Sequence, residues 1–151
     1  MPKVRLDASD WRIIGELQKD GRLNAAELSR RIGLSPPAVA GRVRKLEASG
    51  VIAGYRLDLD LSRAGYPILA FVRIRLEKGQ PAMFQQDVAS RLEILECHLV
   101  TGDDCFIVKV ATESLDQLKR VVLELGRFGA TTTAIVFSSP VSYRIISPPC
   151  T

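Results

Sequence analysis

The residues that could carry catalytic or metal chemistry are few. The chain has one histidine, His98, and three cysteines, Cys97, Cys105 and Cys150. The cysteines form no C-x-x-C pair, and only one histidine is available to help them bind a metal. No Ser/His/Asp, Cys/His or phosphate-loop constellation is present, and one histidine leaves little acid–base machinery. The sequence therefore predicts a protein that is not an enzyme, needs no cofactor and keeps its thiols reduced.

The basic side chains are unevenly distributed along the 151 residues. Residues 1–66 contain 12 Lys and Arg against 8 Asp and Glu, whereas residues 67–151 contain 9 of each. Clustered positive charge attracts the phosphate backbone and releases its counterions. The whole net charge of +4 thus lies in the first part of the chain and favours a nucleic-acid partner there. The alternative is an ordinary solvated surface.

The elements that would position these cations have the pattern of a helix-turn-helix. The hydrophobic period predicts helices over residues 8–19, 24–32 and 35–49. The second and third helices are joined by a short turn at Gly33, which is the signature of this motif. The β-branched run 51–57 predicts a short strand and a wing.

The remainder of the chain predicts a second domain after a linker. Residues 58–67 lose the hydrophobic period and contain glycine and proline, which is typical of a hinge. The elements expected after it are a strand over 68–76, a helix over 80–92, strands over 94–100 and 106–111, a helix over 114–128 and a strand over 131–141. This β-α-β-β-α-β order is the ferredoxin-like arrangement, an antiparallel sheet with both helices on one face. We therefore predict an α+β protein with a winged helix-turn-helix domain over 1–57 and a ferredoxin-like domain over 68–151.

The expected strands have apolar side chains on both faces. In the first of them, Leu69 and Phe71 oppose Ala70 and Val72. A single sheet with one solvated face should carry polar residues there. We therefore predict that the second face packs on another copy of the chain, which makes a homodimer. The alternative is a twisted sheet half covered by the linker.

Several short motifs follow one another in a fixed order. They are Leu6-Asp7-x-x-Asp10, Leu17-Gln18-Lys19-Asp20-Gly21-Arg22, Glu27-Leu28-Ser29, Gly33-Leu34-Ser35, Arg42-Val43-Arg44-Lys45-Leu46-Glu47, Gly50-Val51-Ile52-x-Gly54-Tyr55, Glu96-Cys97-His98-Leu99-Val100-Thr101-Gly102-Asp103 and Ile135-Val136. The series resembles the leucine-responsive and asparagine-regulator (feast/famine) family of prokaryotic transcriptional regulators over nearly the whole chain. The resemblance implies a second domain that dimerises, often assembles dimers into octamers, and binds amino acids or related metabolites between dimers.

The third helix is the expected DNA-reading element, with its stripe of Val39, Val43 and Leu46 buried. Its N-terminal residues offer thymine-methyl contacts and close approach but few hydrogen bonds, and Arg42 is the one side chain expected to read guanine bidentately. So little direct readout predicts degenerate, A/T-rich sites selected by bending and groove shape. Other cations are assigned to phosphates, and each arginine could instead be a solvated surface cation. The candidate DNA-binding residues are Ser35, Pro37, Ala38, Gly41, Arg42, Arg44, Lys45 and Arg56.

The candidate effector site is the turn formed by Gly102, Asp103, Asp104 and Cys105. An amino acid needs N–H donors for its carboxylate and acceptors for its ammonium group, and this turn supplies both. In relatives the same loop lies at the contact between dimers and takes part in effector binding. Many relatives have an aspartate where this chain has Cys105, which argues against leucine as the effector. The alternatives are a purely structural turn and, for Cys105, a redox-sensitive thiol.

These features predict a sequence-specific DNA-binding transcriptional regulator that responds to an amino acid or a related small metabolite. A nucleoid-type architectural DNA-binding protein of low sequence specificity is the alternative. A detached metabolite-binding module is a further rival, against which the basic helix-turn-helix argues. Residues 1–10 are charged, and no apolar run approaches about eighteen residues. We therefore expect a cytoplasmic protein without membrane contacts.

Overall fold

The computed structural model describes residues 4–77, 81–102 and 106–149, and these form two compact units. Unit 1 contains the described residues up to Asp58 together with residues 141–149, and unit 2 contains the described residues from Leu59 to Pro140. The sequence prediction had placed residues 141–149 in the second domain. We call residues 141–149 the return segment, because they bring the chain back to unit 1.

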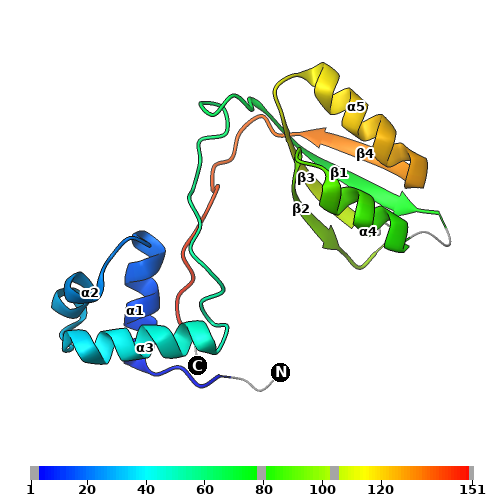
Figure 1. Cartoon of the computed structure of the whole chain (residues 1–151). Helices are drawn as coiled ribbons and strands as arrows, with labels where there is room; N and C mark the ends of the chain where they lie inside the picture. The colour runs from blue at the N-terminus through cyan, green and yellow to red at the C-terminus, as the bar shows by residue number, and fades with distance from the viewer. Residues whose placement is uncertain (1–3, 78–80, 103–105, 150–151) are drawn as a thin grey trace. The chain divides into compact units, whose positions relative to one another are not determined.

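Unit 1 is built on three helices, α1 (Ala8–Lys19), α2 (Ala25–Ile32) and α3 (Pro36–Ala48), drawn in Figure 1. Asn24 caps α2, because its side chain accepts hydrogen bonds from two backbone N–H groups of the first turn while Glu27 bonds back to the Asn24 N–H. The predicted helices are therefore confirmed. Their apolar stripes meet in one core, formed by Ile13, Ile14, Leu23, Leu28, Ile32, Val39 and Leu46.

The predicted strand over 51–57 is wrong. Residues 51–52 form a bend and residues 53–57 run on without secondary structure. A β-branched composition favours a strand only where a neighbouring strand can pair with it, and no described residue of unit 1 lies in a strand. The segment is held instead by Ile52, whose N–H donates to the Leu46 carbonyl at 3.1 Å, and by the side chain of Tyr55 described below.

Unit 2 is an antiparallel four-stranded sheet in the order β2-β3-β1-β4. Both helices, α4 and α5, cover the same face of this sheet in Figure 1, so the predicted ferredoxin-like arrangement is confirmed. The elements are β1 (Ile68–Leu76), α4 (Pro81–Ser90), β2 (Ile94–Leu99), β3 (Phe106–Thr112), α5 (Leu115–Leu125), a 3-10 turn (Gly126–Phe128) and β4 (Gly129–Ile135).

The core of unit 2 lies between the helices and the sheet. Phe84 of α4 is fully buried, and its ring centroid lies 4.7 Å from that of Phe106 and 5.6 Å from that of Phe128. The helix expected over 80–92 is shorter, so Leu92 lies beyond the end of α4 and is 95% exposed. The helix ends earlier than its hydrophobic spacing predicts because Arg91 turns the chain, with its N–H donating to the Val88 carbonyl.

The face of the sheet without helices is mixed. Phe71 is 39% exposed, and Leu69 and Ile107 are half-buried, but Arg73 and Lys109 project from the same face. The strand β4 ends at Ile135 instead of residue 141, because the last sheet bond runs from the Val136 N–H to the Leu69 carbonyl at 2.8 Å. Among the described residues, no helix is long and apolar enough to cross a membrane.

Candidate nucleic-acid interface

The start of α3 presents an exposed surface with few hydrogen-bonding groups. Ser35 stands at the N-cap, but its hydroxyl makes no capping hydrogen bond. The two prolines that follow it have no N–H, so the first turn has fewer unsatisfied donors than an ordinary helix start. Pro37 and Ala38 are exposed next to this hydroxyl. The arrangement offers one free hydroxyl beside a smooth apolar surface.

Gly41 lies in the middle of α3 without a packing reason to be glycine. Its backbone is helical, and a Cβ atom at this position would meet nothing within 4 Å. Glycine inside a helix costs about 1 kcal/mol relative to alanine. The fold of unit 1 therefore does not explain this residue, whereas close approach of another molecule would.

Arg42 is partly exposed, and its guanidinium group is paired with two carboxylates of unit 1. Its Nη1 atom lies 2.7 Å from Asp7 Oδ2 and 2.7 Å from Asp10 Oδ1, and Asp10 is only 6% exposed. The two carboxylates raise the pKa of Arg42. Residue 42 follows Val39 by three positions and precedes Leu46 by four, so helical spacing puts it at the edge of the buried stripe of α3. That spacing was the signal that the sequence prediction missed.

Asp7 and Asp10 are the site residues that sequence reasoning did not single out. Each accepts the other's backbone N–H, at 2.8 Å for the Asp10 N–H and 3.1 Å for the Asp7 N–H, and together they form the capping box of α1. The hydrogen bond from the Asp10 N–H lowers the pKa of Asp7 most, and the hydrogen bond from Arg42 lowers it further. The cap of α1 thus also holds the middle of α3.

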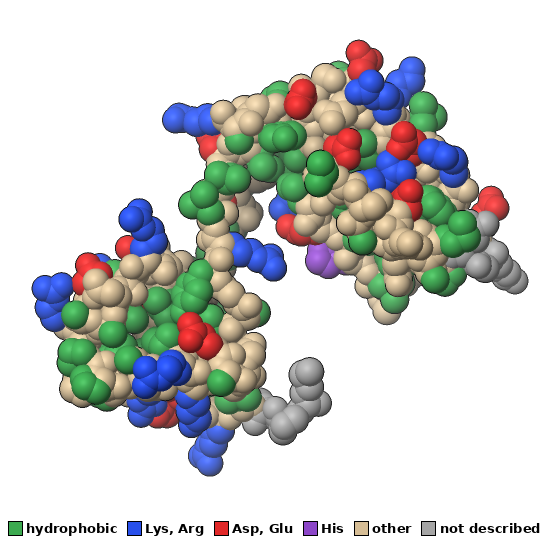
Figure 2. Space-filling view, in the orientation of Figure 1, with side chains coloured by type: hydrophobic (Ala, Val, Ile, Leu, Met, Phe, Trp, Pro, Cys, Tyr) green, Lys and Arg blue, Asp and Glu red, His purple; other side chains and the backbone are tan. Residues whose placement is uncertain are grey.

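The remaining predicted cations, Arg44, Lys45 and Arg56, are exposed in unit 1. Figure 2 shows Lys and Arg side chains projecting from several sides of the helical unit, with acidic side chains between them. Arg44 and Lys45 belong to α3 itself and lie in its C-terminal half, beyond the exposed surface at its start. Arg56 lies beyond the helix in the segment without secondary structure.

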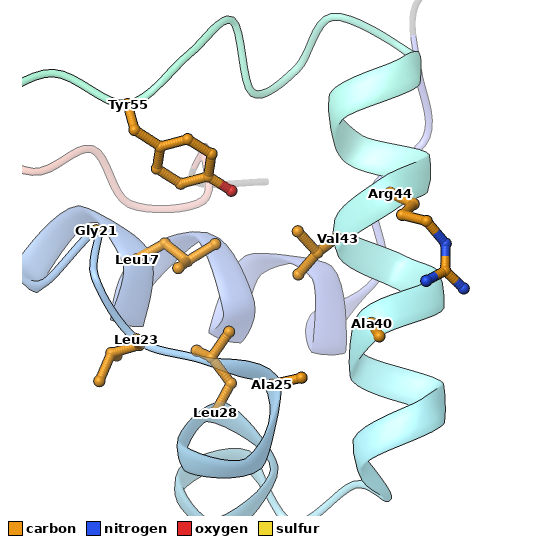
Figure 3. A pocket seen from close by; sticks show the side chains of 9 residues that line it. All are labelled: Leu17, Gly21, Leu23, Ala25, Leu28, Ala40, Val43, Arg44 and Tyr55. Carbon is orange, nitrogen blue, oxygen red and sulfur yellow. The ribbon is translucent and has the colours of Figure 1, made fainter.

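A small apolar cavity of about 260 Å³ lies beside α3. In Figure 3 the Tyr55 ring lies on the opposite side of the cavity from Leu28, while Arg44 points away from it. The Tyr55 hydroxyl donates to Glu47 Oε1 at 3.0 Å, and partial burial together with this carboxylate raises the pKa of Tyr55. Tyr55 therefore holds the chain that leaves α3 against the helices.

Only the beginning of the predicted effector turn can be placed. Gly102 is exposed with φ of 116°, a conformation that favours glycine. Asp103, Asp104 and Cys105 lie outside the described residues. The flanking strand residues Leu99 and Phe106 line a surface cavity of about 440 Å³ together with Cys97, and burial raises the pKa of the Cys97 thiol. No group of three or more potential metal ligands occurs in the part of the chain that the structure describes.

The helix-turn-helix unit and the ferredoxin-like unit define a DNA-binding transcriptional regulator with a ligand-binding domain. Residues 6–53 match the family model for winged helix-turn-helix DNA-binding domains, and residues 69–146 match that for the Lrp/AsnC ligand binding domain. The chain therefore belongs to the Lrp/AsnC family of transcriptional regulators, as its motifs predicted.

Known relatives extend the match to most of the chain. The Bacillus subtilis regulator LrpC is 34% identical over 89% of this chain and 94% of its own length, and the Escherichia coli K12 leucine-responsive regulatory protein is 40% identical over 82% of this chain and 77% of its own. The solved structure of LrpC has a TM-score of 0.89 at 33% identity, covering 93% of this chain and 100% of that one. A transcriptional regulator of Neisseria meningitidis in complex with L-Met has a TM-score of 0.88 at 25% identity, covering 94% and 96%.

Proposed function

We propose that this regulator reads DNA with the exposed side of α3 and changes its binding when an amino acid or related metabolite occupies unit 2. The observation that carries the first part is the uncapped start of α3, where the Ser35 hydroxyl, Pro37 and Ala38 lie open to solvent. Such a surface suits thymine methyl groups and close approach to the groove better than a hydrogen-bonded base code. The preferred sites are therefore A/T-rich, with bending and groove shape supplying much of the selectivity.

The roles of the individual cations follow from their surroundings. Arg44, Lys45 and Arg56 are exposed and contact phosphates, which fix the register but carry no sequence information. Arg42 is bound to Asp7 and Asp10, so it positions α3 relative to α1. This role replaces the guanine reading expected from the sequence.

The chain acts as a homodimer that pairs two recognition helices on half-sites one helical turn apart. Exposed Phe71, with Leu69 and Ile107, supports the helix-free face of unit 2 as the surface that meets the second copy. Assembly of dimers into an octamer is proposed from family membership.

The effector is an amino acid or a close relative, bound at the turn that contains Gly102, Asp103, Asp104 and Cys105. The Lrp/AsnC ligand binding domain and the L-Met complex of the Neisseria regulator support this class of ligand. Leucine itself is disfavoured, because Cys105 stands where many relatives have a carboxylate. Effector binding alters the assembly of dimers and so the path of the DNA.

The test is binding of the purified protein to DNA from upstream of its own coding sequence, over a salt series, with and without a pooled set of amino acids. The logarithm of the affinity should fall linearly with that of the salt concentration, and Arg44→Ala or Lys45→Ala should each reduce the slope by about 0.9. Arg120→Ala, an exposed arginine of α5, is the matched control and should leave the slope unchanged. Absence of binding under every condition would overturn the proposal.

The architectural alternative is favoured by the same sparse base-reading surface, and footprinting separates the two. Short protected segments repeated with the period of the DNA helix indicate a regulator. Continuous protection that is indifferent to sequence indicates an architectural protein.

A further inference from the structure

The return segment is bound to α1 by a pair of specific hydrogen bonds. The Gln18 side chain donates through Nε2 to the Ile146 carbonyl at 3.0 Å, and its Oε1 accepts the Ile146 N–H at 2.9 Å. A single side-chain amide thereby engages both backbone groups of one residue, as a neighbouring strand would. This geometry fixes which residue of the return segment sits at Gln18.

The other segment that connects the units is anchored at the same end of α1. The Tyr55 ring lies beside Gly21, where an added Cβ would be 3.5 Å from Tyr55 Cδ1, and it lines a cavity with Leu17. Leu17 and Gln18 are consecutive residues in the last turns of α1. The chain that leaves unit 1 and the chain that returns to it are therefore both held on one short stretch of helix.

Within unit 2 the same two segments also begin side by side. The strands β1 and β4 are antiparallel neighbours, with Ala70 opposite Ile135, and the Val136 N–H donates to the Leu69 carbonyl at 2.8 Å. The linker enters β1 and the return segment follows β4. A displacement of β4 against β1 therefore acts on both connections at once.

We propose that the return segment is a second tether between the units and that the two hydrogen bonds of Gln18 hold it on α1. If the linker were the one connection, the helix-turn-helix unit could rotate about it. Two connections that both end on α1 oppose that rotation. The ligand-binding unit is thus linked to α1 at two points, and a change in its strands β1 and β4 reaches the helix that Arg42 joins to α3. The tether is independent of which DNA or effector the regulator binds.

The test uses limited trypsin digestion of the full-length protein without DNA. Arg144 lies inside the return segment, and cleavage after it requires the segment to leave its site, because a protease needs several residues of mobile chain. Gln18→Ala removes both hydrogen bonds and should raise the rate of this cleavage about tenfold. Gln86→Ala, an exposed glutamine of α4, is the matched control and should leave the rate unchanged.

A second measurement reports directly on the hydrogen bond between Gln18 and Ile146. Hydrogen exchange of the Ile146 amide should accelerate in Gln18→Ala, and the fluorescence of Trp11 in α1 should show that unit 1 remains folded. A chain that stops after Pro140 should bind DNA with half-sites at altered spacings nearly as well as at the preferred one, while a chain that stops after Ser147 should keep the preference.

Equal cleavage after Arg144 and equal Ile146 exchange in Gln18→Ala and the unaltered protein would overturn the tether. Failure of all DNA binding with a slow Arg144 cleavage would instead overturn the proposed function alone.

Discussion

The Nη1 atom of Arg42 lies 2.7 Å from Oδ1 of Asp10, and this ion pair joins α3 to the first turn of α1. The partner carboxylate is almost completely buried, and its polar contacts are the arginine and the backbone N–H of Asp7. The same Nη1 atom also reaches Asp7, so one cationic nitrogen serves both carboxylates. Bidentate reading of guanine uses two nitrogens of the guanidinium group, and in Arg42 one of its three is already held by the carboxylates.

Replacement of Arg42 separates the two roles. Arg42→Lys retains one cationic nitrogen and should keep most of the thermal stability and the DNA sequence preference, because a lysine can still reach the carboxylates. Arg42→Ala leaves Asp10 buried without its cation and should lower both the unfolding temperature and the DNA affinity. Thermal unfolding and selection of preferred sites from random DNA check the two expectations. If Arg42→Lys changes the base preference but leaves the stability unaltered, Arg42 contacts guanine as the sequence predicted.

The capping box of α1 predicts a loss of stability in acid. The folded pKa of Asp7 lies below its ordinary value of 3.8, so the folded state binds fewer protons than the unfolded state near that pH. The stabilisation by Asp7 is therefore complete above the unfolded pKa and is lost as the pH falls through the folded pKa. Trp11 fluorescence should show a falling unfolding temperature below about pH 4, with a weaker fall in Asp7→Asn. Asp58→Asn, an exposed carboxylate of unit 1, should follow the unaltered protein.

The glycine at position 41 has two explanations, close contact with DNA or an unoptimised helix position, and Gly41→Ala distinguishes them. Gly41→Ala should stabilise α3 by about 1 kcal/mol, because the added methyl group meets nothing within 4 Å. If the DNA backbone approaches here, the same variant should bind DNA about tenfold more weakly despite its greater stability. Gly15→Ala in α1, equally open, is the matched control and should gain stability without a change in affinity. Unchanged affinity in Gly41→Ala would remove this residue from the DNA-binding surface.

The local signals of the sequence predicted the elements well. The hydrophobic period located α2 to within one residue, and the strand expected over 68–76 has the observed bounds of β1. These signals are local because they depend on the helical or strand period of neighbouring residues. Most of the fold of both units therefore followed from the pattern alone.

The features that the sequence did not reveal depend on contacts between distant residues. The bonds between Gln18 and Ile146 join residues 128 positions apart and leave no periodic pattern in the sequence, so the attachment of the return segment to α1 could not be predicted. The strand expected over 51–57 failed for the same reason, because pairing is decided by a partner elsewhere in the chain. Of the proposed DNA-binding surface, the exposed start of α3 was predictable from the sequence. The pairing of Arg42 with Asp7 and Asp10 was not, because it depends on the packing of α1 on α3.

A last prediction concerns the stability of unit 2 when Gly129, at the start of β4, is replaced. This residue begins β4 opposite Leu76 with φ of 155°, and a Cβ atom here would lie 2.1 Å from the Arg75 carbonyl oxygen. Gly129→Ala must therefore push apart two paired backbones as well as adopt a strained conformation, and should destabilise unit 2 by about 2–4 kcal/mol.

The matched control is three residues earlier. Gly126 has an ordinary helical backbone and open space around its Cα, so Gly126→Ala should be neutral or should stabilise by up to about 1 kcal/mol. Urea unfolding followed by circular dichroism measures the whole fold, and Trp11 fluorescence isolates unit 1, since the chain has a single tryptophan. Equal stability of the two alanine variants would show that β4 can shift away from Arg75 at little cost, and the close pairing of β1 with β4 at this end of the sheet would then be an adjustable contact.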